Sequence, residues 1–495
     1  MTGPGGRGRV AAAVATVAAV LALALRFAAT GPLWLDEALS VNIARLPLRD
    51  LPGALRHDGS PPLYYLLLHG WLRAFGTGPV AVRALSAVVA VATVPAAWWF
   101  AREVSRSRRV AWVAALLVAT SPFAARYGSE ARMYALVQLL VALGGTALVR
   151  LYRRPSALSF AAVAACSGLL ALTHYWALFL LAAVAGLLAL LRAWRGVLAV
   201  AAGAVLFAPW LPAFAFQLRH TGTPWAPRPQ LASIVEALLE WSGPGTGGRF
   251  LAVLLLLLAF LAVLGAGVDA RRVELDLRGR PLGRRLGAVV LATLALGIVS
   301  GLLLGSGYAA RYTSVVLVPF LVLAAAGTET LLDERVRTGV VAVAAMLGLV
   351  AAVPYVLTPR TQAGAVAAAL RARAVPGDVV VYCPDQLGPA VSRLAPPGLV
   401  QRVYPTGGAP ERVDWVDYQR RNAAADPAAF AASVLAAAPG RTVWLVSMGG
   451  YRTYSDSCDV LGERLRAARS AGAETVVRSR GRYKPERMAL VRFAP

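Results

Sequence analysis

Long apolar runs separated by short polar connections are the feature that most constrains how this chain can fold. A helix that crosses a bilayer needs roughly 17 to 22 apolar residues. About eleven runs are close to this length, near residues 10–28, 81–101, 110–125, 133–150, 156–173, 176–192, 196–212, 250–267, 286–305, 312–327 and 338–357. The composition agrees, since 58% of the 495 residues are hydrophobic and only 15% are charged. We therefore predict a mainly α, polytopic membrane protein.

The basic residues indicate which side of the membrane each connection faces. The formal net charge is +25, and the positive charge lies in clusters between apolar runs, which does not favour a nucleic-acid-binding protein. The clusters occupy every second connection, with members Arg102, Arg106, Arg108, Arg109, Arg150, Arg153, Arg154, Arg192, Arg195, Arg271, Arg272, Arg278, Arg280, Arg284, Arg285, Arg335 and Arg337. Basic residues are enriched in cytoplasmic loops. We expect a multi-pass protein of the cell membrane with a cytoplasmic N-terminus and an extracytoplasmic C-terminal region.

The pattern of the chain changes after about residue 358. Apolar stretches become short, with helices expected at 363–374, 387–394 and 461–471, and strands at 378–382, 442–447, 474–477 and 488–493. Alternating helices and strands are typical of a layered α/β domain. We predict two domains, a membrane domain over residues 1–357 and an extracytoplasmic α/β domain over residues 358–495.

The three cysteines do not form a metal-binding pattern. Cys166 lies within an apolar run, whereas Cys383 and Cys458 both lie in the C-terminal region. An oxidising compartment would allow these two to pair. The sequence gives no distance between Cys383 and Cys458, so the question of whether they form a disulfide stays open.

An acid pair follows directly on the first apolar run. Asp36 and Glu37 stand beside Trp34 in the connection 29–80, which the arginine pattern places outside the cytoplasm. A carboxylate at that boundary could act as a general base or hold a divalent cation. The alternative is a helix N-cap or a solvated loop acid. We predict that Asp36 and Glu37 are catalytic residues. The sequence by itself establishes no cofactor.

A second polar cluster occupies a short turn on the same predicted side. Arg126, Glu130, Arg132 and Tyr134 lie within nine residues between two apolar runs, and charges at such depth are usually functional or paired. Arginines suit a phosphate, and Glu130 would take a sugar or a second acid role. Alternatively, Glu130 only pairs with an arginine, while the tyrosines belong to an interfacial aromatic belt.

Further candidates lie in the remaining connections on that side. An apolar stretch over residues 60–71 is too short to span and predicts an interfacial helix. Arg311 would snorkel to the surface or bind an anionic lipid headgroup, and His174 is either a substrate ligand or a belt residue with a satisfied hydrogen bond. The substrate-binding candidates are His57, Asp58, Tyr64, Tyr65, Tyr134, His174, Tyr175 and Tyr312.

Taken together, these motifs resemble the GT-C glycosyltransferases over about residues 10–330. The similarity is to the group of protein mannosyltransferases and aminoarabinose transferases. It rests on Trp34-Leu-Asp-Glu37, Ser60-Pro-Pro-Leu-Tyr-Tyr65, Arg83-Ala-Leu-Ser86, Tyr127-Gly-Ser-Glu-Ala-Arg-Met-Tyr134, Thr173-His-Tyr-Trp176 and Ala310-Arg-Tyr312. One departure is Ser60, where aminoarabinose transferases tend to have a lysine.

The resemblance implies transfer of a mannose- or arabinose-like sugar from a polyprenyl-phosphate donor, usually with inversion. The acceptor would be an extracytoplasmic glycolipid, cell-wall polysaccharide or protein. Asp36 would be the base and Glu37 its helper, while Arg132 and Arg311, with Arg126 as a further candidate, would neutralise the phosphate. Two alternatives stay open: a transporter or flippase of lipid-linked saccharides, which would need polar groups at mid-bilayer, and a non-catalytic scaffold of the cell envelope.

Overall fold

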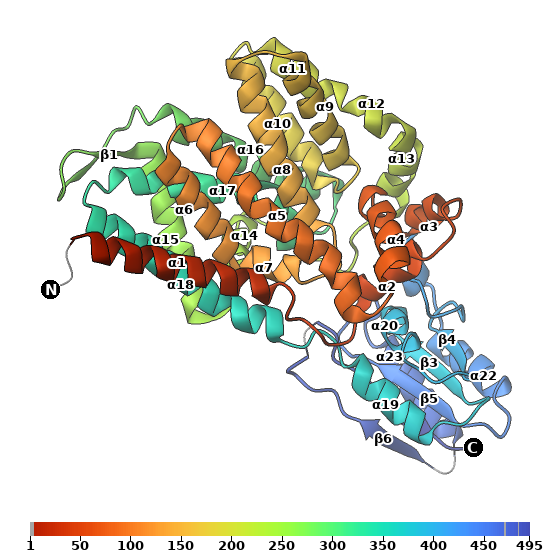
Figure 1. Ribbon diagram of the computed structural model, residues 1–495. Helices are drawn as coiled ribbons and strands as arrows, with labels where there is room; N and C mark the ends of the chain where they lie inside the picture. Colours follow the sequence, from red (N-terminus) through yellow and green to blue (C-terminus); the bar gives the residue numbers. More distant parts are fainter. Residues whose placement is uncertain (1–3, 470–471, 484) are drawn as a thin grey trace.

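The computed structural model describes residues 4–469, 472–483 and 485–495, and most of them form a bundle of long helices (Figure 1). Seven helical segments in the described chain are long and apolar enough to cross a membrane. They are α5 (Pro79–Ser105), α8 (Tyr134–Arg153), Trp194–His220 with α11 (Trp194–Ala202), α12 (Ala204–Phe207) and α13 (Leu211–His220), α15 (Gly245–Leu264), α16 (Pro281–Leu304), Ala310–Thr330 with α17 (Ser314–Gly327), and α18 (Glu334–Leu357).

The remaining predicted crossings are shorter or bent helices. Helices α6 (Arg108–Thr120) and α7 (Pro122–Gly128) form one span bent by 54°, because Ser121 caps a new helix that has Pro122 in its first turn. The others are α1 (Pro4–Leu25), α9 (Ala157–Ala171) and α10 (Trp176–Leu190). Helices thus occupy all the predicted crossings within the described residues, and the prediction of a polytopic, mainly α protein is confirmed.

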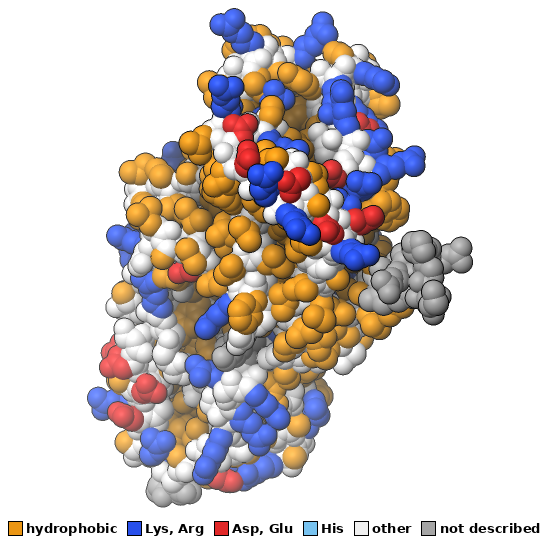
Figure 2. Space-filling model, turned by 90° about the vertical axis from the view of Figure 1, so that its left-hand side faces the viewer, with side chains coloured by type: hydrophobic (Ala, Val, Ile, Leu, Met, Phe, Trp, Pro, Cys, Tyr) orange, Lys and Arg blue, Asp and Glu red, His pale blue; other side chains and the backbone are white. Residues whose placement is uncertain are grey.

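Helix α17 forms the centre of the bundle and is buried over its whole length. Outer helices such as α15 instead expose apolar side chains, including Phe250, Val253 and Leu256. Figure 2 shows hydrophobic side chains dominating a broad band of the surface, with basic and acidic side chains gathered beyond it at both ends. Such a band is what a lipid-facing surface requires, and the chain is a multi-pass membrane protein.

The connection between α1 and α5 is helical and lies at one end of the bundle. It contains α2 (Leu35–Ala44), α3 (Leu51–Asp58) and α4 (Leu63–Phe75), and Figure 1 shows them beside the C-terminal domain. Helix α4 is the short helix predicted over residues 60–71, and it begins directly after Pro62. This end of the bundle carries the acid pair.

A five-stranded sheet forms the centre of the C-terminal domain. Its strand order is β4-β3-β5-β7-β6, with β3 parallel to β4 and β5, and β7 antiparallel to β5 and β6. The bounds are β3 (Val379–Cys383), β4 (Val400–Val403), β5 (Val443–Ser447), β6 (Ala473–Val477) and β7 (Ala489–Phe493), with helices α19 (Ala363–Arg373), α20 (Gly388–Ser392), α21 (Tyr418–Ala423), α22 (Pro427–Ala436) and α23 (Ser457–Ala468). The domain division after residue 357 stays a prediction, although α18 ends there.

Some helices and strands of the structure were not predicted from the sequence. Strand β4 has only four residues at the sheet edge and is partly exposed, so no alternation of apolar residues predicts it. Helices α21 and α22 were also not predicted, nor was the hairpin of β1 (Gly265–Gly267) and β2 (Val273–Leu275) in an arginine-rich connection. The predicted helix over 461–471 is α23, and residues 470 and 471 lie outside the described residues.

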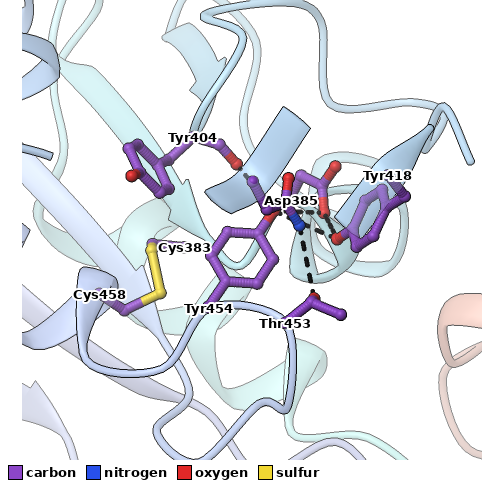
Figure 3. The surroundings of a disulfide bond; sticks show 8 residues. Cys383, Asp385, Tyr404, Tyr418, Thr453, Tyr454 and Cys458 are labelled. Carbon is purple, nitrogen blue, oxygen red and sulfur yellow. Dashed lines mark hydrogen bonds between the residues drawn. A yellow bond between two sulfur atoms is a disulfide. The ribbon is translucent and has the colours of Figure 1, made fainter. Parts of the chain in front are cut away.

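Cys383 and Cys458 form a disulfide bond. It joins the end of β3 to the start of α23, and the two half-cystines are 75 residues apart in the chain. Figure 3 shows the buried Asp385 nearby, which accepts hydrogen bonds from the hydroxyls of Tyr418 (2.5 Å) and Tyr454 (3.0 Å). Cys166 on α9 is free.

Candidate active site

Asp36 and Glu37 both lie in the first turn of α2. The helix begins here because Trp34 is extended, with φ −87° and ψ 174°, and because the Glu37 carboxylate accepts a hydrogen bond from the Trp34 N–H at 3.4 Å. Acidic residues in a first turn also interact favourably with the helix dipole. The side chains of Asp36 and Glu37, although adjacent in the sequence, lie in different surroundings.

Glu37 is fully buried in a network of ion pairs. Arg83 donates to both of its carboxylate oxygens, at 2.7 and 2.6 Å, and Arg360 donates to one of them at 3.3 Å. The N–H of Ala131 adds a bond of 3.1 Å. Burial opposes ionisation, but the two guanidinium groups outweigh it and hold the pKa of Glu37 below its ordinary value. Glu37 is therefore an ionised carboxylate whose contacts join α2, α5 and the start of the C-terminal domain.

Arg83 also holds the chain that leads into α2. Its guanidinium donates to the carbonyl oxygens of Ala29 (3.1 Å), Gly31 (2.6 Å) and Pro32 (3.0 Å). Sequence reasoning noted Arg83 only within a motif and gave it no role. Its signal was an arginine more than a turn inside an apolar helix, where an uncompensated charge is costly.

Asp36 lies between two arginines from distant parts of the chain. Its Oδ2 is 3.5 Å from Nη2 of Arg311 and 3.9 Å from Nε of Arg132. Arg132 comes from the turn before α8, and Arg311 lies in the single 3-10 turn (Ala310–Thr313) before α17. The structure thus brings together the predicted base and two of the three predicted phosphate ligands.

Several polar atoms around Asp36 have no hydrogen-bond partner among the described residues. They are Asp36 Oδ2, Arg132 Nε, Arg311 Nε and the Tyr134 hydroxyl, and all four are buried. Most buried polar atoms in proteins are hydrogen-bonded. Such a group of mainly donor atoms beside one carboxylate is suited to a polar, anionic ligand.

Asp58 and Tyr65 extend the polar site beyond Arg132. The Tyr65 hydroxyl donates to Asp58 Oδ2 at 2.9 Å, and Arg132 Nη1 lies 3.4 Å from that hydroxyl and 3.2 Å from Ser40 Oγ. Burial raises the pKa of Asp58, and Arg132 opposes this effect. These two predicted substrate ligands therefore lie next to the predicted phosphate ligand.

Aromatic rings form another side of the site. The His174 ring lies 5.8 Å from the Tyr134 ring and 5.2 Å from the Tyr312 ring, measured between centroids. Burial, with Arg132 and Arg311 nearby, lowers the pKa of His174 to about 3. The imidazole is therefore neutral at physiological pH, and its Nδ1 accepts from the Trp176 N–H at 3.1 Å.

Other predicted site residues are engaged with protein groups. Arg126 lies 3.6 Å from the buried Glu130, which also pairs with Arg360 at 3.5 Å. Burial raises the pKa of Glu130, against the effects of Arg360 and Arg126. This geometry matches the alternative in which Glu130 pairs with an arginine, and it does not place Arg126 or Glu130 beside Asp36.

Three aromatic or imidazole candidates likewise contact protein groups. Exposed His57 lies 3.0 Å from Asp414 of the C-terminal domain. Tyr64 contacts Ser86 at 3.0 Å. Tyr175 donates to Gln217 and accepts from Trp210. Their side chains contact other elements of the protein, and the structure does not place them next to Arg132 as it does Tyr65.

The C-terminal domain and one loop of the membrane domain contribute groups that sequence reasoning missed. Besides Arg360, Glu486 accepts a hydrogen bond from the Leu35 N–H at 2.7 Å, directly before Asp36. Trp225, from the connection after α13, lies under the Arg311 guanidinium at 4.7 Å and packs against the core of the C-terminal domain. No local pattern marked these residues, because their partners are far away in the sequence, 323 positions for Arg360 with Glu37 and 451 positions for Glu486 with Leu35.

The donor set around Asp36 does not fit a metal ion. Within the described residues, no group of three or more His, Cys, Asp and Glu side chains could hold one. Asp36 is also flanked by two guanidinium groups, which repel a cation. The charged groups nearest to Asp36 are these two fixed positive charges.

No protein-family model matches the chain, and a search of curated protein sequences finds no match. Solved structures do match. ArnT from Cupriavidus metallidurans in the apo state has a TM-score of 0.63 at 15% identity, with 98% of each chain covered. Its complex with undecaprenyl phosphate has a TM-score of 0.60 at 14% identity, with 99% of this chain and 98% of that chain covered.

A more distant similarity is to the archaeal oligosaccharyltransferase AglB from Archaeoglobus fulgidus. It has a TM-score of 0.52 at 12% identity, covering 93% of this chain and 72% of that chain, and was solved with an inhibitory peptide and a dolichol-phosphate. The GT-C fold implied by the sequence motifs is confirmed.

Proposed function

We propose that this chain is an integral-membrane glycosyltransferase that moves a sugar from a polyprenyl-phosphate donor to an extracytoplasmic acceptor. The observation that carries the proposal is the position of Asp36 between Arg132 and Arg311 at one end of the bundle. The fold it shares with ArnT, whose structure holds undecaprenyl phosphate, supports the same donor class.

In this proposal Asp36 is the general base. It accepts the proton of an acceptor hydroxyl while the oxygen forms a bond to the anomeric carbon of the sugar. The bond from that carbon to the phosphate oxygen breaks, and the phosphate leaves with the electron pair. A single displacement of this kind inverts the anomeric centre.

Arg132 and Arg311 bind the departing phosphate. Their guanidinium groups offer several donors each, and both Nε atoms lack a hydrogen-bond partner among the described residues. Charge-assisted contacts to a phosphate are among the strong hydrogen bonds in proteins. Fixed positive charge at the position where negative charge develops lowers the barrier.

Glu37 takes a positioning role in this proposal, in place of the helper role the sequence suggested. Its carboxylate is held by Arg83 and Arg360, so it has no oxygen available for an acceptor proton. Through these ion pairs it fixes the first turn of α2. Glu130 and Arg126 act in the same way on the turn that carries Arg132.

The sugar would lie against the aromatic side of the site. Tyr134, Tyr312 and the neutral His174 present flat apolar faces, while Asp58 and Tyr65 offer polar groups on another side. A mannose- or arabinose-like sugar, as the motifs imply, has both kinds of surface. The acceptor would be a glycolipid, a cell-wall polysaccharide or a protein.

The decisive experiment replaces Asp36 by Asn in the purified full-length protein. With a synthetic polyprenyl-phosphate sugar as donor, we expect Asp36→Asn to lower kcat by roughly 100- to 10,000-fold, the range for loss of a general base. The melting temperature should stay near that of the wild type, because Asp36 lies at the site and is not part of the Glu37 network. Transfer at the wild-type rate by Asp36→Asn would refute the assignment.

A transporter of lipid-linked saccharides is the main rival. It calls for polar groups at mid-bilayer, whereas the charged cluster of this chain lies at the end of the bundle with α2, α3 and α4. Sugar transfer by the wild type from a lipid-phosphate donor would exclude this rival and the non-catalytic scaffold together. Absence of transfer with every such donor would favour them.

A further inference from the structure

A cavity of about 400 Å³ lies inside the membrane domain, away from Asp36. Its walls are almost entirely apolar and come mainly from α5, α8, α9, α10 and α16, with one residue each from α11 and α17. Examples of the lining residues are Phe100, Val141, Leu148, Val184 and Val289. The volume falls within the range of roughly 300 to 1,000 Å³ typical of ligand pockets.

The cavity occupies the half of the bundle that is opposite to the candidate active site. Helix α8 begins at Tyr134 beside Asp36, but it lines the cavity only from Val141 to Arg153, its last residue. Helix α16 contributes residues from its first turns, such as Leu282 and Arg285. The arginine pattern predicts that this half faces the cytoplasmic leaflet.

Two arginines line the cavity at that end, Arg153 and Arg285. Arg285 is exposed and forms no ion pair with any described residue. Arg153 shares the Glu103 carboxylate with Arg150, at 4.0 and 2.8 Å respectively. The Glu103 carboxylate thus faces two arginines, and Arg153 also donates to the backbone carbonyls of Glu103 and Val104. Arg285 adds a further positive charge that no described carboxylate balances, so this end of the apolar cavity carries a surplus of positive charge.

We propose that this cavity binds one acyl chain of an anionic phospholipid whose phosphate contacts Arg285 and Arg153. The acyl chain fits the apolar walls, and the surplus charge selects an anionic headgroup over a zwitterionic one. Basic pockets between membrane helices on the cytoplasmic side bind anionic headgroups in this manner. The site is separate from the proposed donor site, because the donor phosphate contacts lie at the other end of α8.

The test uses full-length protein, delipidated in detergent and analysed by native mass spectrometry. The probes are phosphatidylglycerol and phosphatidylcholine with identical acyl chains. We expect the wild type to retain one phosphatidylglycerol in preference to phosphatidylcholine. Arg285→Gln should weaken retention about five-fold, the effect of one surface arginine. The matched control is Arg284→Gln, which removes the same charge from the neighbouring position, outside the cavity lining.

A second pair of variants tests the cavity itself. Val184→Phe fills the cavity and should abolish retention of phosphatidylglycerol. Val253→Phe makes the same change on the exposed face of α15 and should have no effect. The melting temperature of each variant shows that it is folded.

Four results would overturn the proposal. The first three are equal retention of the two phospholipids, equal losses in Arg284→Gln and Arg285→Gln, and retention that survives in Val184→Phe. A fourth is displacement of phosphatidylglycerol by undecaprenyl phosphate but not by a short-chain prenyl phosphate, because the cavity would then hold the tail of the carrier. Sugar transfer is not a readout in any arm, so this test stands apart from the proposed function.

Discussion

At the scale of single residues, the Asp36 carboxylate lies between two arginines, Arg132 and Arg311, whose surroundings differ. Arg311 lies over the Trp225 ring at 4.7 Å and 3.5 Å from Asp36. Arg132 contacts Ser40 and the Tyr65 hydroxyl. These contacts fix each guanidinium plane, and a fixed plane is what bidentate recognition of a phosphate requires.

Arg311 therefore provides a prediction about the donor phosphate. Arg311→Gln should lower kcat/KM for the lipid-phosphate donor by about 100-fold, the order of losing one transition-state donor. Arg311→Lys keeps the charge but loses the planar fork and the stacking on Trp225, so it should recover only part of the activity. Steady-state kinetics with varied donor concentration measure both. Wild-type kinetics in both variants would contradict a phosphate contact.

The buried pair of Arg83 and Glu37 leads to a prediction about stability. Arg83→Met leaves the Glu37 carboxylate buried with one of its two arginines missing, and breaking a buried pair typically costs about 3 to 5 kcal/mol. We expect a clearly lower melting temperature in detergent. The double variant Arg83→Met with Glu37→Gln should lose less than the sum of the single losses, because it leaves neither a Glu37 carboxylate without Arg83 nor an Arg83 guanidinium without Glu37, while Arg360 keeps Glu130. Additive losses would show that the pair is not coupled.

At the scale of elements, α2 is held from both sides. Arg83 on α5 holds its first turn from the membrane domain, and Glu486 holds the Leu35 N–H from the C-terminal domain. Trp34 and Leu35 also pack into the core of that domain. The position of Asp36 therefore depends on the docking of the two halves of the chain.

The Glu486 contact predicts a pH dependence of stability. Burial raises the pKa of Glu486 from 4.5 to about 8, so the folded protein keeps a proton that the unfolded chain loses at lower pH. The contribution of this group to stability is complete below about pH 4.5 and declines as the pH rises to about 8. Glu486→Gln, which is always neutral, should lack this decline.

Melting temperatures of both proteins between pH 5 and 9 test this expectation. The difference between wild type and Glu486→Gln should shift in favour of the variant as the pH rises. Gln retains an oxygen that can accept from the Leu35 N–H, so the contact itself is preserved. A pH-independent difference would show that Glu486 does not titrate in this range.

At the scale of the whole molecule, the disulfide reports on both stability and sidedness. The Cys383–Cys458 bond closes a segment of 75 residues, and the chain-entropy relation assigns such a loop about 4.5 kcal/mol. Reduction, or Cys383→Ser with Cys458→Ser, should lower the melting temperature of the C-terminal domain. A disulfide also forms mainly outside the cytoplasm, in line with the predicted location of this domain.

Labelling with a maleimide polymer measures the disulfide in protein from membranes. In the unfolded, unreduced chain only Cys166 should react, because it is the free cysteine. After reduction all three cysteines should react. Three labels without reduction would argue for a reduced and therefore cytoplasmic C-terminal domain.

The sequence by itself determined the helical crossings, most strands of the C-terminal sheet and the candidates Asp36, Arg132 and Arg311. Hydrophobic length and alternation are local properties, because a bilayer or a sheet acts on each segment separately. For the same reason, polar residues stood out wherever they interrupted an apolar pattern. The short edge strand β4 had no such pattern and was missed.

Only the tertiary structure decided which of these polar residues act together. It separated Asp36 from its neighbour Glu37, brought Arg360 to Glu37 across 323 positions of the chain, and paired Glu130 with Arg126 and Arg360. A carboxylate between two arginines and a carboxylate buried in an ion-pair network have the same local sequence signal. Their difference comes from partners that folding brings together, because Coulombic and hydrogen-bond energies depend on distances in space.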